Sequence, residues 1–140
     1  MTKSHAQHAI IHEEDPFMKV LFVHERFGAL GGAEVNILST AGELARYGHE
    51  AGLLHGQGTG KQEDAWHETF HVCFPYSETD GVARLESALN QFKPDIIFLH
   101  KMADLAMVEA LTDCTVPVVR MVHDHDLTCM RSYKYNPITR

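Results

Sequence analysis

From Lys19 onward, short apolar segments bounded by turn residues alternate with amphipathic segments of helical spacing. A short apolar run of this kind is typical of a strand buried on both faces of a sheet. Such strands are predicted at residues 19–24, 50–55, 69–72, 95–100 and 116–123. Helices are predicted at residues 33–47, from about residue 80 to the stop at Pro94, and at 104–111, while residues 56–66 are predicted to be a polar loop. No other feature constrains the fold as strongly, because strand, helix and strand in succession form parallel pairs.

Right-handed crossovers between these strands predict an α/β fold. We expect a Rossmann-like, doubly wound parallel sheet of about five strands in the order 3-2-1-4-5, with helices on both faces. Residues 1–17 have no period and are predicted to be a poorly ordered tail, which leaves residues 18–140 as one domain.

Charge and composition exclude several classes of protein. The chain has 12 basic and 19 acidic residues and a net charge of −7, which argues against a nucleic-acid binder. Its three cysteines are too few and too scattered for a disulfide framework or a zinc ribbon. We find no apolar segment long enough to span a bilayer and no signal peptide, so a cytoplasmic protein is expected, and the sequence predicts no cofactor.

Four of the predicted strands end in a histidine, at His24, His55, His100 and His123. In the predicted strand order, the first, fourth and fifth strands are neighbours, so His24, His100 and His123 should line one rim at the carboxyl ends of the strands. Three interpretations are open. The histidines could hydrogen-bond loop backbone, hold a metal ion with the carboxylates of residues 123–126, or bind a hydroxylated ligand such as a sugar.

A glycine pair, Gly31-Gly32, is followed by Ala33 and Glu34 where the first helix is predicted to begin. Glycine lets a ligand approach the backbone, and the free N–H groups of a helix start favour an anion. The segment matches neither the dinucleotide fingerprint nor a Walker loop. A glycine turn with no ligand is the alternative.

Four segments together resemble glycosyltransferase family 4. MKVLFVHERFGALGGAE resembles the family's first strand, glycine loop and helix, and GHEAGLLHG resembles its second strand. KPDIIFLH and PVVRMVHDHDLTCMR resemble two later strands, the last with its following loop. The resemblance covers residues 18–140 and implies the N-terminal domain of a GT-B enzyme.

The resemblance implies roles for individual residues. Gly31 and Gly32 match the segment facing the donor diphosphate, and His123 matches the histidine that reaches the donor sugar. We expect Asp124, together with His123, to be catalytic. The remaining residues expected to line the cleft or border the acceptor are His24, Glu34, His100, His125 and Arg131. The family is typically retaining and uses no bound metal; its donor is a nucleotide sugar, and its acceptor is a glycan, a lipid or a small molecule.

A family member also has a second Rossmann-like domain that holds the nucleotide sugar, and the printed sequence does not supply it. We therefore expect an excised domain or a truncated gene product that is inactive alone. It should self-associate through the face left open and be cytoplasmic or peripheral at the membrane.

Two alternative functions are open: a non-catalytic module that binds a sugar, a phosphate or a partner, and a small metal-dependent hydrolase. The hydrolase would use His24, His100, His123 and Asp124.

Overall fold

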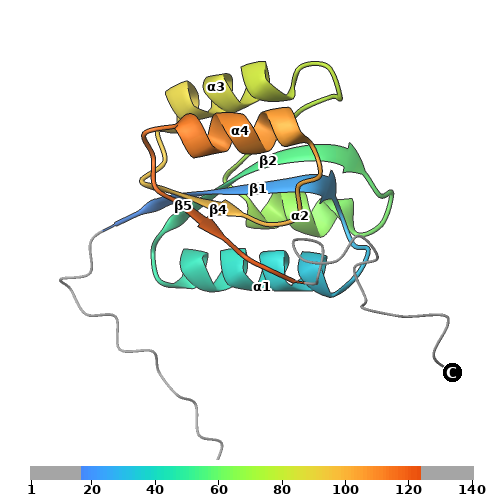
Figure 1. Cartoon of the computed structure of the whole chain (residues 1–140). Helices are drawn as coiled ribbons and strands as arrows, with labels where there is room; N and C mark the ends of the chain where they lie inside the picture. Colours follow the sequence, from blue (N-terminus) through green and yellow to red (C-terminus); the bar gives the residue numbers. More distant parts are fainter. Residues whose placement is uncertain (1–16, 124–140) are drawn as a thin grey trace, which may run out of the picture.

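The computed structural model describes residues 17–123, so the predictions for residues 1–16, Asp124, His125 and Arg131 lie outside the described residues. Strands and helices alternate along this part of the chain (Figure 1). In chain order they are β1 (Lys19–Phe27), α1 (Gly32–Arg46), β2 (Glu50–Gly58), α2 (Glu63–Thr69), β3 (Val72–Pro75), α3 (Gly81–Phe92), β4 (Ile96–Leu99), α4 (Leu105–Asp113) and β5 (Val118–Arg120).

The five strands form one sheet in the order β3-β2-β1-β4-β5, and every pair in it is parallel. The predicted α/β class, strand order and parallel pairing are thus confirmed. The chain adds strands to one side of β1 as far as β3 and then returns to the other side with β4. The strand order reverses between β1 and β4, which is where an open sheet of this kind binds ligands, at the carboxyl ends of its strands.

Helices cover both faces of the sheet, as predicted: α1 and α2 lie on one side and α3 and α4 on the other (Figure 1). Alternate residues of β1 supply the two cores, since Val20 and Phe22 pack with α1 and α2 while Leu21 and Val23 pack with α3 and α4. Trp66 of α2 is 1% exposed and is the largest side chain in the first core.

The segment between the second and third strands was predicted incorrectly. The stretch predicted as a loop contains the end of β2 and the start of α2, and the third strand is Val72–Pro75 and not residues 69–72. The seven residues of α2 contain a single large apolar side chain, that of Trp66, so the helix shows no apolar stripe along the sequence.

The predicted ends of three strands also need correction. β1 continues to Phe27 and β2 to Gly58, so neither ends at its histidine, and β5 ends at Arg120, before His123. The added residues of β1 and β2 pair with each other: Arg26 lies opposite Gln57, and Phe27 lies opposite Gly58. Backbone pairing between neighbours thus outweighs the low strand propensity of residues 56–58.

Candidate active site at the carboxyl edge of the sheet

The structure brings His24, His100 and His123 together, as the predicted strand order implies. The His100 Nδ1 and His123 Nε2 atoms are 2.8 Å apart and share a hydrogen bond. The ring centroid of His100 is 5.1 Å from that of His123 and 6.3 Å from that of His24. The three rings therefore form a row with His100 in the middle, which we call the histidine row.

The histidine row runs from the core to the surface. His24 and His100 are fully buried, whereas His123 is exposed. His100 packs against Phe22 and Phe98, with centroid distances of 5.7 and 4.4 Å. Because its neighbours are aromatic and its position is fixed by β4, His100 offers His123 a rigid partner.

His55, the fourth histidine of the pattern, is not part of the histidine row. Its ring stacks on Phe27 with the centroids 4.2 Å apart, and its Nδ1 lies 2.9 Å from the backbone oxygen of Gly56, to which it donates. Burial lowers the pKa of His55. Of the three interpretations of the strand-end histidines, a hydrogen bond to backbone therefore describes His55.

A buried carboxylate at the start of α1 holds the inner end of the histidine row. Glu34 is 5% exposed, and its Oε1 lies 3.0 Å from Nε2 of His24. Its Oε2 accepts a hydrogen bond of 2.8 Å from the backbone N–H of Gly31, which completes the helix cap. One side chain thus ties the glycine loop, residues 28–32, to the core.

The charge state of this pair follows from its hydrogen bonds. Burial alone raises the pKa of Glu34, but the hydrogen bonds from its own backbone N–H, from His24 and from Gly31 together lower that pKa below its usual value. Burial lowers the pKa of His24, although Glu34 opposes the effect. At neutral pH Glu34 is therefore ionised and His24 neutral, and His24 must carry its proton on Nε2 because a carboxylate only accepts.

Neither glycine of the predicted anion site is packed against another strand or helix, which is also true of Gly42, Gly48 and Gly60. A Cβ added to Gly32 would meet nothing within 4 Å, and one added to Gly31 would meet only Glu34 Oε2, at 3.6 Å. By contrast, Gly28 has a φ of +101° and a Cβ there would lie 2.5 Å from Thr59 Oγ1. Folding requires glycine at Gly28 but not at Gly32, where glycine weakens the helix start. The space beside Gly32 is open to a ligand.

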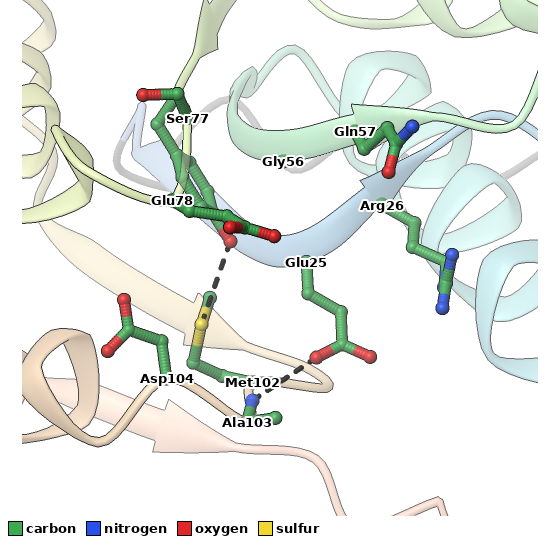
Figure 2. Close-up of a pocket in the computed structure, with 10 residues that line it drawn as sticks. Glu25, Arg26, Gly56, Gln57, Ser77, Glu78, Met102, Ala103 and Asp104 are labelled. Atoms are coloured by element: carbon green, nitrogen blue, oxygen red, sulfur yellow. Dashed lines mark hydrogen bonds between the residues drawn. The ribbon is translucent and has the colours of Figure 1, made fainter.

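A cavity of about 810 Å³, which the sequence did not predict, lies at the same edge of the sheet, on the side of α3 and α4 (Figure 2). The residues that line it come from the ends of β1 and β2 and from the segments after β3 and β4. They are Glu25, Arg26, Gly56, Gln57, Tyr76, Ser77, Glu78, Met102, Ala103 and Asp104. The signal that could have found the cavity is the convergence of four strand ends, but the ends of β1, β2 and β3 were predicted in the wrong places.

Carboxylates dominate the charge of this cavity. The side chains of Glu25, Glu78 and Asp104 lie around Met102, and Arg26 is the one cationic residue of the lining among residues 17–123 (Figure 2). Glu25 Oε2 accepts a hydrogen bond of 3.2 Å from the backbone N–H of Ala103. Such a lining favours neutral, hydroxylated or cationic ligands over anions.

Tyr76 adds a polar group to the cavity wall. Its hydroxyl lies 3.6 Å from Sδ of Met102 and donates to it. Burial, with the carboxylates of Glu25 and Asp104, raises the pKa of Tyr76 to about 12. Tyr76 therefore stays a phenol, and because its one proton is donated to Met102, its hydroxyl oxygen offers the cavity an acceptor.

Comparison with known families decides what kind of chain this is. The family model of Glycosyltransferase Family 4 matches residues 30–140, and the match corresponds to the N-terminal domain of that family. The chain belongs to glycosyltransferase family 4. No curated protein and no solved structure matches it.

In this family 4 domain, the residues matched to the donor and those of the histidine row meet at one edge. Gly31, Gly32 and His123 are exposed, whereas His24, Glu34 and His100 are buried behind them and do not line the cavity. No three His, Cys, Asp or Glu side chains within residues 17–123 gather so as to hold a metal ion. None of the four helices in this range has the length and apolar character needed to cross a membrane.

Proposed function

We propose that this family 4 domain is the acceptor-side half of a retaining glycosyltransferase that takes its sugar from a nucleotide sugar. The observation that carries the proposal is the open backbone at Gly32, next to a glycine loop that Glu34 ties to the histidine row. Residues 18–140 would form this domain and residues 1–17 a tail. We also propose a cytoplasmic location, at the membrane surface if the acceptor is a lipid.

The proposed reaction breaks the bond between the sugar C1 and the diphosphate oxygen and forms a bond from C1 to an acceptor oxygen, whose proton passes to the leaving diphosphate. Negative charge develops on the leaving diphosphate. The free N–H groups at the start of α1, reached past Gly31 and Gly32, would stabilise that charge. His123 would hydrogen-bond the transferred sugar, and Asp124, His125 and Arg131 would border the acceptor.

We further propose that the cavity holds the acceptor. Its volume of about 810 Å³ accommodates a small sugar or a comparable molecule. Carboxylates at Glu25, Glu78 and Asp104 accept hydrogen bonds from hydroxyl groups and repel anions. The domain should therefore prefer a neutral hydroxylated or a cationic acceptor to a phosphorylated one.

The donor half of the proposal is tested with the 140-residue chain alone. Transfer needs donor and acceptor held together away from water, and that positioning supplies much of the rate. Gly31 and Gly32 are exposed, and a solvated helix start contributes only about 1 kcal/mol to anion binding. We expect uridine- and guanosine-diphosphate sugars to bind with a Kd above about 1 mM, which corresponds to roughly −4 kcal/mol, and to be neither transferred nor hydrolysed.

The measurements are a calorimetric or NMR titration and an assay for released sugar. Micromolar binding, or turnover without an added donor domain, would place the donor site within these residues and contradict the half-enzyme proposal. For the acceptor, saturation-transfer NMR with neutral and phosphorylated monosaccharides should detect the neutral ones. The Glu78→Gln variant should reduce the preference for the neutral monosaccharides.

A further inference from the structure

We infer that His100 sets the tautomer of His123: His100 donates its Nδ1–H to Nε2 of His123, which leaves the Nδ1–H of His123 as the group offered to a ligand. His100 is then a positioning residue that acts through His123. The inference deepens the proposed function, on which it rests for the statement that His123 meets a ligand. The tautomer itself follows from contacts within residues 17–123.

The first step is that His100 carries one ring proton. Its side chain is fully buried against Phe22 and Phe98, where a charged imidazolium would lose its hydration. Burial, followed by the neighbouring rings of His123 and His24, lowers the pKa of His100 to about 3. His100 is therefore neutral throughout the physiological range and has one N–H to place.

The second step decides which nitrogen holds that proton. The other ring nitrogen of His100, Nε2, is buried and has no hydrogen-bond partner among the described residues. The same is true of His24 Nδ1, so no hydrogen bond joins these two rings. A proton on His100 Nε2 would be a buried donor without an acceptor, which folded proteins avoid more strictly than an unpaired lone pair. On Nδ1 the proton is shared with His123 Nε2, 2.8 Å away.

The third step concerns His123. If its Nε2 accepts from His100, a neutral His123 must carry its own proton on Nδ1. Free neutral histidine favours the proton on Nε2, so His100 reverses the ordinary preference. His123 is exposed and would present a donor at a fixed position. That donor suits an oxygen with a free lone pair, such as a sugar hydroxyl, and does not suit a group that can only donate, such as an ammonium.

The tautomer is tested on the 140-residue chain, labelled with ¹⁵N, by long-range ¹H–¹⁵N correlation of the imidazole rings at neutral pH. The His123 signals are assigned by their loss in His123→Ala. We expect the Nδ1 of His123 to have the shift of a protonated nitrogen and its Nε2 that of an unprotonated one. The opposite pattern in the unaltered protein overturns the inference.

A pair of variants separates positioning from packing. His100→Phe keeps a ring packed against Phe22 and Phe98 but removes the donor, so His123 should move to the ordinary tautomer with its proton on Nε2. His100→Asn keeps a donor close to the place of Nδ1 and should retain the tautomer of the unaltered protein. An unchanged His123 spectrum in folded His100→Phe, or loss of the tautomer in folded His100→Asn, overturns the inference.

Circular dichroism establishes which variants are folded, and the spectrum of the unaltered chain decides the question if His100→Phe is not. These spectra involve neither a ligand nor turnover. If His123 is found in the other tautomer, the proposed glycosyl transfer is not affected. If the sugar-nucleotide prediction is wrong, the inference about the tautomer is not affected.

Discussion

Replacing Glu34 with alanine should destabilise the domain more than any other single loss of a carboxylate on α1. Besides its own backbone N–H, Glu34 accepts from Nε2–H of His24 at 3.0 Å and from the backbone N–H of Gly31 at 2.8 Å. His24 is fully buried, so water cannot replace the lost acceptor without opening the core. Truncation therefore leaves a buried N–H unsatisfied and uncaps the helix at once.

The magnitude follows from the two contacts. A buried donor without a partner costs roughly 1–3 kcal/mol, and loss of a helix-capping contact costs about 1 kcal/mol. Removing a buried carboxylate also removes its desolvation penalty, which offsets part of this cost. We expect Glu34→Ala to lower the free energy of unfolding by roughly 2–3 kcal/mol.

The assay is urea unfolding followed by circular dichroism, with a matched control on the same helix. Glu43 contacts Arg46 at 2.7 Å, but their side chains are 57% and 67% exposed. Glu43→Ala should therefore change the stability by less than about 0.5 kcal/mol. If Glu34→Ala were no more destabilising than Glu43→Ala, the reasoning about the buried pair would be refuted.

A double-mutant cycle isolates the pair itself. His24→Phe leaves Glu34 without its side-chain donor, and Glu34→Leu leaves His24 without its acceptor, so both single changes should destabilise. The double variant has apolar side chains at both positions and should be less destabilised than the sum of the two, with a coupling of about 1 kcal/mol or more. Additive effects would mean that the 3.0 Å contact carries no energy.

Three further outcomes are expected. Acidification from neutral pH to about 5.5 should lower the free energy of unfolding by roughly 1 kcal/mol through His100. The pKa of His100 is lowered from 6.5 to about 3 in the folded chain, so the unfolded chain binds the proton first as the pH falls. Urea unfolding at several pH values should show a smaller loss in His100→Phe. In the same assay, Gly28→Ala should lower the free energy of unfolding by at least about 1 kcal/mol, because Gly28 has a positive φ and close neighbours. Gly32→Ala should leave the free energy of unfolding within about 0.5 kcal/mol of that of the unaltered protein. His123→Ala should change the melting temperature little, because water can enter the space left by the exposed side chain and accept from His100 Nδ1–H. In a complete enzyme the same change should lower turnover by about tenfold or more, and near-normal turnover would count against the role of His123.

The sheet could be predicted from the sequence because its signal is local. Buried parallel strands are short apolar runs, and the apolar residues of β1 and β4 stand out against the turn residues around them. The order of the strands followed from the handedness of the crossovers. Once the order was known, His24, His100 and His123 had to lie near one another, and the 2.8 Å contact between the last two confirms their neighbourhood.

The extension of the strands could not be predicted, because it depends on contacts between strands. A Cβ on Gly56 would clash with the backbone oxygen of Glu25, so the glycine that reads as a turn residue is what lets β2 run close beside β1. The cavity depends on this extension, since Glu25, Gly56 and Gln57 are among its lining residues. A sequence pattern shows propensity along one strand but not the space between two.

The role of Glu34 was also hidden in the sequence. A glutamate three residues after a helix cap predicts a capping contact, and Glu34 makes it with Gly31. Nothing in the pattern showed that its second oxygen would meet His24, because that contact depends on where α1 packs on the sheet. We expected Glu34 to line a cleft; in the structure its side chain is 5% exposed, with its oxygens held by His24 and Gly31.

The buried pair explains how the domain can keep an open glycine loop without losing its shape. A Cβ added at Gly32 would meet nothing within 4 Å, so no side-chain packing at this position fixes the loop, and its place depends on the contacts beside Gly32. One of these contacts is that of the Gly31 N–H, held by Glu34, and Glu34 is held in turn by His24 at the inner end of the histidine row. The outer end of the same row positions His123 through His100. A change at Gly32 should therefore affect ligand approach alone, whereas a change at Glu34 should disturb the loop and the fold together.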